Sequence, residues 1–526
     1  MELDALDRIA ASAFDGFLVR KDLVRRYSRQ YPVPTYVVEF LLGRYCATVN
    51  EAEIAEGLQV VERQLTDRAV RTGQEELFKA RAREKGSVKL IDIVKAKLDS
   101  RNDCFLAELP SLQLDDVRID DKLVHEHERM LTDGFYAEVT LTYDAAIAQE
   151  KNGRPFAIDS LRAIQLSKSD VLNVMAKARS QFTTQEWRNF LIRSIGLEPA
   201  ALSERAQIVT LLRMVPFVER NYNMVELGPR GTGKSHLFQQ ISPYSHLISG
   251  GKATVAKMFV NNASGQRGLV CHYDVVCFDE VAGISFDQKD GVNIMKGYMA
   301  SGEFSRGKES IRASGSIVMV GNLDVDVEQQ QRISHLLAPL PPEMRYDTAF
   351  MDRLHSYVPG WEFPKVNPNE QLTGHFGLVS DFLSECWTKL RESSRVSVLQ
   401  GRVNWGGALS GRDIEAVTRT TSGMLKLLFP DPTMPVPDEE LEKIVRLALE
   451  CRRRVKEQQK RVLKTEFRNS HFSYFMGTEG VEQFVSTPEL HSEDRIESDP
   501  LPPGQVWAIS AGDQDVSPGL YRIEVT

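Results

Sequence analysis

The chain has 526 residues, which is too long for one ordinary hydrophobic core and predicts roughly two to four domains. Its hydrophobic content of 42% and charged content of 26% are typical of a globular protein, and no run approaches the ~20 apolar residues of a membrane span. The net charge of −8 argues against a uniformly basic nucleic-acid binder, and the scattered cysteines and acidic N-terminus favour a reduced cytoplasm without a membrane partner.

The first two regions are predicted from their local patterns. Residues 1–85 read as helical and charged, and we expect a small DNA-binding-like domain there. Residues 86–199 mix helices with strand-like runs such as 135–143, which favours a mixed α/β region with a small β-barrel of OB type. Residues 20–29 carry five cations and an aromatic, a pattern more often found on a solvated helix face than at a DNA contact.

Residues 228–235 form a complete G-x-x-x-x-G-K-[ST] phosphate-binding loop (P-loop), with the sequence Gly228-Pro229-Arg230-Gly231-Thr232-Gly233-Lys234-Ser235. Residues 222–227 before it read as a buried strand, and residues 236–241 can open a helix. The glycines let backbone N–H groups and the helix N-terminus face a triphosphate. Lys234 would reach the β- and γ-phosphates, and the Ser235 hydroxyl would ligate Mg²⁺. The sequence therefore predicts an ATP- and Mg²⁺-dependent nucleoside triphosphatase; the alternative is a glycine turn with an exposed lysine.

An apolar strand that ends in two acids follows about 40 residues later, at 274–280. Asp279 would hold Mg²⁺ through its water shell, and Glu280 would polarise the attacking water as a general base. The alternative is a strand that ends in solvated carboxylates. A third strand, 316–322, ends in Asn322, which suits a sensor that hydrogen-bonds the γ-phosphate or the water. An asparagine that starts a turn is the alternative.

Two arginines downstream are candidates for contact with the γ-phosphate. Arg353 follows a short helical stretch and, in a ring, would reach the neighbouring subunit's nucleotide as an arginine finger in trans. Arg345 is a rival for this role, and we prefer Arg353. Arg412 opens an amphipathic helix and is placed as a second sensor in cis, or in a surface salt bridge to Asp413 or Glu415.

A hairpin is predicted between the acidic strand and the Asn322 strand, because glycines at 302 and 307 flank alternating residues. Arg306 and Lys308 near its tip would face phosphates without reading bases, or would be a solvated basic turn. Residues 261–268 are polar and are a second candidate for a pore loop.

The last third of the chain reads as helical and then changes composition. Residues 386–480 are expected to form a helical lid and C-terminal helices, including a basic stretch at 452–464 that reads as a solvated face or a DNA contact. Residues 481–503 read as an acidic, proline-dotted linker, and 504–526 as two strands of a hairpin that starts a further domain.

The order of P-loop, acidic strand, asparagine strand, arginine finger and helical lid resembles an AAA+ ATPase module over residues 200–430. We therefore expect an α/β fold: a core at 200–385 with a parallel sheet flanked by helices, and the nucleotide at the C-terminal strand ends. The runs at 223–235, 278–280, 321–322, 352–355 and 357–361 resemble more narrowly the BrxL family, the Lon-like AAA+ component of BREX bacteriophage-defence systems.

This resemblance implies an α+β N-terminal region and ATPase core similar to those of MCM helicases. It also implies a homo-hexamer or double hexamer, double-stranded DNA in the channel and other BREX proteins as partners. The C-terminal domain of that family resembles the Lon protease; because only its opening, 501–526, is present here, peptidase activity is not expected in this chain. The competing functions are a DNA-encircling or translocating ATPase, an ATP-dependent protease or protein unfoldase, and an inactive scaffold, which the intact ATPase residues disfavour.

Overall fold

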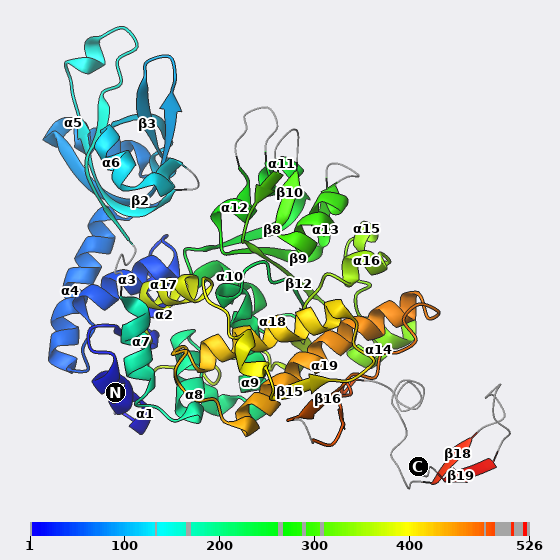
Figure 1. Ribbon diagram of the computed structural model, residues 1–526. Coiled ribbons are helices and arrows are strands. Elements are labelled where there is room, and N and C mark those ends of the chain that lie inside the picture. Colours follow the sequence, from blue (N-terminus) through cyan, green and yellow to red (C-terminus); the bar gives the residue numbers. More distant parts are fainter. Residues whose placement is uncertain are drawn as a thin grey trace. The chain divides into compact units, whose positions relative to one another are not determined.

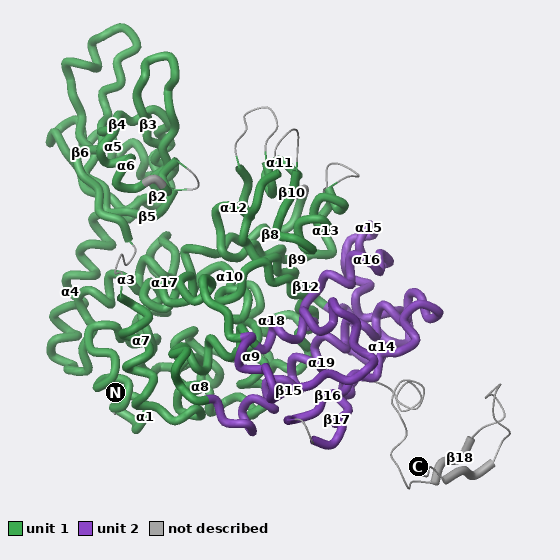
Figure 2. Tube along the Cα trace, viewed as in Figure 1, with its two compact units in different colours: residues 1–322, 358–395, 422–435 green, residues 323–357, 396–421, 436–526 purple. Residues whose placement is uncertain are grey.

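The computed structural model describes residues 3–131, 134–164, 170–260, 267–286, 291–305, 310–477, 480–489, 506–509 and 519–522. The chain divides into two compact units, shown in green and purple in Figure 2. Unit 1 comprises residues 1–322, 358–395 and 422–435, and unit 2 comprises 323–357, 396–421 and 436–526. Within the described ranges, no helix is both long and apolar enough to cross a bilayer.

Unit 1 begins with a helical segment, as the sequence predicts. Its helices are α1 Ala5–Ala13, α2 Lys21–Gln30, α3 Thr35–Tyr45, α4 Glu51–Arg68 and α5 Glu75–Lys85. Helix α1 starts at Asp4, whose carboxylate accepts a hydrogen bond from the Asp7 N–H at 2.8 Å in a capping box. Strand β1 Leu18–Arg20 pairs antiparallel with β14 Phe376–Leu378, so the N-terminal segment is hydrogen-bonded to the later part of the unit.

A small closed barrel follows, which confirms the predicted β-barrel. Its strands are β2 Ser87–Asp99, β3 Cys104–Leu109, β4 Leu114–Ile119, β5 Phe135–Tyr143 and β6 Phe156–Ala163, closed in the order β2-β3-β4-β6-β5. Short helix α6 Asp121–Glu126 lies between β4 and β5. Alternate residues of β5 are buried, as the two-residue period of a strand requires, and Val139 and Leu141 join the barrel core. The domain boundaries at 85/86 and 199/200 stay predictions.

Five strands form the sheet of the ATPase region, in the spatial order β13-β7-β12-β9-β8. They are β7 Met224–Gly228, β8 Ser245–Ala253, β9 Val275–Phe286, β12 Ser316–Asn322 and β13 Ser356–Pro359. Strand β12 pairs parallel with both β7 and β9, and β8 pairs parallel with β9. The predicted parallel sheet is confirmed (Figure 1). The order places the asparagine strand β12 between the P-loop strand β7 and the acidic strand β9.

Helices α9 Glu204–Val218, α10 Lys234–Gln240 and α12 Leu269–His272 contact this sheet. The other helices of this part of the chain are α7 Val171–Arg179, α8 Thr184–Ser194, α11 Val255–Met258, α13 Gly291–Ser301 and α17 Ser380–Leu390. Helix α9 contacts β12, and α10 contacts both β8 and β9. Helix α10 begins directly after the P-loop, as the motif requires.

The predicted hairpin between β9 and β12 is confirmed. Strand β10 Glu303–Ser305 pairs antiparallel with β11 Ser310–Arg312, and Gly302 before it has φ +70°, which favours glycine. Phe304 on β10 is buried against Phe259 and Tyr298, with ring centroids 5.1 and 6.0 Å away. Phe259, Tyr298 and Phe304 therefore belong to the core of unit 1.

Unit 2 is mainly helical, with a small sheet of order β15-β16-β17. Its elements are α14 Val327–Ile333, α15 Pro342–Arg345, α16 Thr348–Met351, β15 Val403–Trp405, α19 Asp438–Val462, β16 Ser473–Met476 and β17 Gln483–Phe484, and α18 Gly411–Leu428 begins in it. At the end of the chain, β18 Val506–Ile509 pairs antiparallel with β19 Gly519–Arg522, so the predicted terminal hairpin is confirmed.

The prediction that the basic stretch at 452–464 is a solvated face or a DNA contact was wrong for residues 452–459, whereas Arg461 and Lys464 are exposed. The side chains of Arg452, Arg453, Arg454 and Lys456 on α19 are buried. Acidic groups of the same unit neutralise them: Arg453 bonds Glu457 at 3.2 Å, for example. Other partners, such as Asp352 and Asp413 for Arg452, come from distant segments, which a run of cations in the sequence does not reveal.

Candidate nucleotide site

The P-loop joins β7 to α10, and its backbone has the conformation that its glycines allow. Gly231 and Gly233 have φ of +82° and +77°, in the left-handed region that side chains rarely adopt. Gly233 is the N-cap of α10, so the first helical N–H groups lie at the end of the loop. The predicted P-loop geometry between strand and helix is therefore present.

The Lys234 side chain folds back over the first residues of the P-loop. Its buried Nζ donates hydrogen bonds to the carbonyl oxygens of Pro229 at 2.6 Å and Gly228 at 3.3 Å. Burial lowers the pKa of the ammonium, and the nearby Glu226 carboxylate opposes that shift. The Lys234 Nζ thus lies among loop carbonyls, beside the amides that would receive phosphate oxygens.

A buried ion pair contacts the backbone of the P-loop. Arg213 of α9 donates to Glu226 of β7 from Nε at 2.9 Å and from a terminal nitrogen at 2.5 Å, and these residues are 3% and 0% exposed. The other terminal nitrogen of Arg213 bonds the Thr232 carbonyl at 3.2 Å, and the guanidinium lies 3.4 Å from the ring centroid of Phe363. Since C=O and N–H of a trans peptide point in opposite directions, this contact turns the Gly233 N–H away from Arg213.

Asn322 ends β12 as predicted, but the acidic pair Asp279–Glu280 lies within β9, which continues to Phe286, so the predicted end of that strand was wrong. Asn322 of β12 is the register partner of Gly228, the first P-loop residue, and Asp279 of β9 is the partner of Ser249 on β8. Gly321 fits closely between the neighbouring strands, because a Cβ there would lie 2.9 Å from Leu227 Cδ2. The structure therefore brings Asn322 and the P-loop together at one edge of the sheet.

Glu280 has an unusual backbone conformation. Its φ is +50°, in the left-handed region that glycine prefers, and its N–H donates to its neighbour Asp279 Oδ1 at 2.9 Å. The side chain is exposed, and β9 continues to Phe286 beyond the acidic pair. Such strain gathers at functional sites, where it directs a side chain away from the regular course of the strand.

Two glycines let β7 approach the segment that follows β13. A Cβ on Gly228 would lie 2.3 Å from the backbone carbon of Gly360, and a Cβ on Gly360 would lie 2.5 Å from the Leu227 carbonyl oxygen. Neither position has room for a side chain. Gly360 therefore packs directly against the strand that leads into the P-loop.

Arg353 and Arg412 both lie in unit 2, around one carboxylate. Arg412, half exposed, pairs with Asp352 at 2.5 Å rather than with Asp413 or Glu415, so the predicted salt-bridge partners were wrong. Burial and then repulsion from Arg412 lower the pKa of the Arg353 guanidinium, which places the two cations within electrostatic range. Because these arginines and the P-loop belong to different units, their roles at the nucleotide stay predictions.

A buried arginine of α19 fixes this arrangement. Arg452 donates to Asp352 at 2.9 Å and to Asp413 at 2.7 Å. Lys456 also donates to Asp413, at 3.0 Å. Although burial opposes them, Arg452 and Arg412 lower the pKa of Asp352. One charged network thus ties the segment of Arg353 to the helix start of Arg412.

The predicted DNA contacts either lie outside the described residues or include cations that pair with acidic side chains. Arg306 and Lys308 lie outside the described residues, as do 261–266 of the second pore candidate. In the N-terminal basic stretch, Lys21 is buried against Glu39 at 3.0 Å, and Arg20 pairs with Asp22 at 2.7 Å. These two cations stabilise the fold of the segment.

A large cavity adjoins the P-loop. It has a volume of about 890 Å³ and is lined by Gly231, Gly233 and His236 on one side and by residues of α2 and the α2–α3 segment on the other. This volume lies within the range of ~300–1,000 Å³ that is typical of small-molecule sites.

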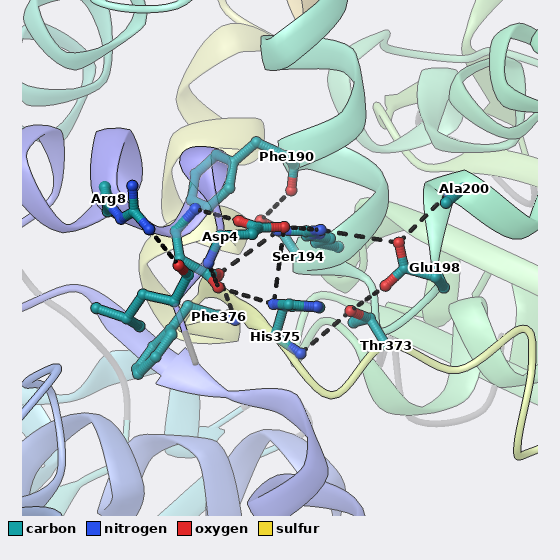
Figure 3. A network of polar contacts seen from close by, with 12 residues as sticks. Asp4, Arg8, Phe190, Ser194, Glu198, Ala200, Thr373, His375 and Phe376 are labelled. Atoms are coloured by element: carbon teal, nitrogen blue, oxygen red, sulfur yellow. Dashed lines mark hydrogen bonds and ion pairs between the residues drawn. The ribbon is translucent and has the colours of Figure 1, made fainter. Parts of the chain in front are cut away.

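A second polar cluster, shown in Figure 3, has the composition of a metal site. Asp4, Asp7 and His375 bring ligand atoms within 4.8 Å of one another, and His375 Nδ1 lies 2.7 Å from Asp7 Oδ2. Arg193, however, already pairs with Asp4 at 2.6 Å and with Asp7 at 3.5 Å. The guanidinium supplies the positive charge of this cluster, which fastens α1 to β14.

Sequence reasoning missed Arg213, Gly360 and Asp352 as functional neighbours, and assigned no role to Glu226. The available signal was Glu226 itself, a charged residue inside the apolar strand before the P-loop. A buried carboxylate requires a partner, but its sequence position does not say which one. The roles of Gly360 and Asp352 depend on contacts between segments far apart in the chain.

Comparison with known proteins gives consistent matches along the chain. The ATPase domain described as "Lon-like protease BrxL-like" matches residues 156–473, and the "BREX system Lon protease-like protein BrxL N-terminal" family matches residues 12–143. "Lon-like protease BrxL" of Escherichia coli O9:H4 (strain HS) is 43% identical over 519 residues, which are 99% of this chain and 74% of that protein. The protein of the same name from Bacillus cereus (strain H3081.97) is 42% identical over 511 residues, 97% of this chain and 75% of that protein.

The ion pair beneath the P-loop gives the first testable prediction. Glu226→Gln should lower the unfolding free energy by about 3–5 kcal/mol, because it leaves Arg213 charged and buried without its partner. Glu303→Gln is the matched control: it removes the exposed Arg312–Glu303 pair and should cost about 0–1 kcal/mol. Urea unfolding of both variants measures the difference. Equal, small effects would show that the buried pair does not support the loop.

Proposed function

The chain belongs to the BrxL family of BREX systems, and we propose that it is a ring-forming ATPase that encircles or moves along double-stranded DNA. Its ATPase domain implies ATP binding. The observation that carries the chemical part of the proposal is the register of Gly228 with Asn322, because it joins the P-loop and the sensor strand at one edge of the sheet.

In the proposed site, each residue has a distinct task. The P-loop amides and Lys234 bind the phosphates, Glu280 polarises the attacking water, and Asn322 positions that water or the γ-phosphate. The Ser235 hydroxyl and Asp279 carboxylate offer the hard oxygen donors that Mg²⁺ prefers, so they fit this ion. When bound, Mg²⁺ would neutralise charge on the β- and γ-phosphates.

The ring and the DNA are further parts of the proposal. Support for the ring is that Arg353 lies within electrostatic range of Arg412 and of Asp352, the carboxylate that pairs with Arg412, so a neighbour's phosphate would act on both cations. Support for DNA is the confirmed β10–β11 hairpin, whose connecting residues include Arg306 and Lys308. Other BREX proteins are the partners that the family implies.

A protease or unfoldase component is the second candidate, because the curated relatives carry the name Lon-like protease. The burial of Met258, Phe259 and Phe304 argues against it, since an unfoldase pore generally presents an exposed aromatic-apolar loop. We therefore favour the DNA-bound ATPase and do not propose peptidase activity for these residues.

Glu280→Gln should retain ATP binding and reduce hydrolysis by ~10²–10⁴-fold, because the water loses its base while the phosphate contacts remain. Steady-state phosphate release and equilibrium ATP binding measure the two effects. Glu303→Gln, in the same unit, should leave both unchanged. Rapid turnover by the Glu280 variant would exclude it as the base.

Arg353→Ala should leave ATP affinity largely unchanged and reduce turnover by ~10³–10⁵-fold, the range for a lost arginine finger. If the finger acts in trans, mixing Arg353→Ala with Lys234→Ala subunits should restore part of the activity, because one intact half-site from each can meet. Native mass spectrometry confirms that mixed rings have formed. A mixed ring without recovery contradicts a role in trans.

DNA affinity should fall by roughly 10³-fold or more between about 50 and 200 mM salt if about six phosphates are neutralised. Unrelated duplexes of equal length should bind alike, because phosphate contacts carry no sequence information. Replacing Arg306 and Lys308 with alanine should flatten the salt dependence in a fluorescence-anisotropy titration. Replacing Arg312, which pairs with Glu303, is the control. An unchanged slope in the double variant would exclude the hairpin as the DNA contact.

A further inference from the structure

The cavity beside the P-loop has two walls that come from distant parts of the sequence. One wall contains the P-loop and the first turns of α10, including Gly233 and His236. The facing wall contains α2 and the residues between α2 and α3, including Arg25, Tyr31 and Val33. A ligand held by the P-loop would therefore extend toward the N-terminal helices.

The two walls are fastened to each other by hydrogen bonds. The Gln240 side-chain oxygen, on α10, accepts from the Thr35 N–H at 3.1 Å and from the Thr35 hydroxyl at 2.9 Å. The N-terminal wall is also anchored to α17, because Glu39 bonds both Lys21 at 3.0 Å and the Ser380 hydroxyl at 2.6 Å. The wall is thus a fixed part of unit 1.

The lining has the chemistry of a nucleoside subsite. Apolar side chains such as Val24, Val33 and Leu197 offer flat contact area, and Gln239 and His236 offer polar atoms at the α10 side. His236 is exposed to the cavity, but the surrounding protein desolvates its ring and lowers its pKa against the opposing Glu39 carboxylate, which favours the neutral ring that both donates and accepts hydrogen bonds. An apolar cavity with a few polar groups suits a purine base and its ribose.

We propose that the N-terminal segment 24–35 forms the far wall of the base and ribose subsite, so that bound ATP bridges the P-loop and the N-terminal helices. The inference rests on the proposed ATPase function. It assigns to the N-terminal region a direct part in nucleotide recognition. The Thr35–Gln240 contact would also let nucleotide binding at α10 act on the N-terminal region.

The test compares two ligands, ATP and inorganic tripolyphosphate, which shares the phosphates but lacks the base and ribose. Val33→Trp should fill the subsite and weaken ATP binding by roughly tenfold or more, equivalent to about 1.4 kcal/mol. Tripolyphosphate affinity should not change. Val60→Trp, on exposed α4 surface away from the cavity, is the matched control and should bind both ligands like the unmodified chain. Calorimetric titration of the full chain measures all affinities.

Each other outcome is decisive. If Val33→Trp binds ATP as tightly as Val60→Trp does, the base does not lie against this wall and the inference is overturned. If the unmodified chain binds neither ligand, the proposed ATPase function fails instead. If Val33→Trp loses both ligands, its fold is disturbed, and Thr35→Val is tested in its place. Weaker ATP binding with unchanged tripolyphosphate binding, each compared with the unmodified chain, supports the inference. Unchanged affinity for both ligands overturns it.

Discussion

The nucleotide site depends on a charge pair that water does not reach. Arg213 and Glu226 hold each other beneath the P-loop, and the remaining guanidinium nitrogen binds the Thr232 carbonyl. Removing charges from water costs free energy that only close, well-aligned partners recover. This pair has two direct hydrogen bonds and a stacked aromatic ring, and the peptide that it fixes directs the Gly233 N–H away from Arg213. The strand, the helix and the loop are thus joined by one side chain.

In unit 2, a buried ion pair likewise holds the chain segments of the arginines that are candidates for sensing the γ-phosphate. Arg452 is buried and shared between Asp352 and Asp413, which holds two chain segments that are sixty residues apart in a fixed relation. Arg412 reaches Asp352 from the half-exposed side. A phosphate that attracts Arg412 would compete with that carboxylate. The cation would therefore exchange one anion for another, and Asp352 would keep the buried Arg452 as its partner.

The sequence predicted the local features well and the partners of charged groups poorly. The P-loop, the strand that ends in Asn322, the barrel and the hairpin with Gly302 follow from short patterns, because turn geometry and strand periodicity are local properties. The burial of Arg452 and Phe304 does not, since it depends on which distant segments pack against them. Arg412 shows the limit clearly: its position at a helix start was correct, but its carboxylate partner lies sixty residues earlier in the chain.

The left-handed backbone conformation of Glu280 has a cost in stability. A residue other than glycine in the left-handed region costs of order 1–3 kcal/mol, which surrounding contacts must offset. Glycine would relieve this cost at position 280, but it would also remove the carboxylate. The fold therefore retains a local conformation that selection for stability alone would discard, as expected for a residue with the proposed role of general base.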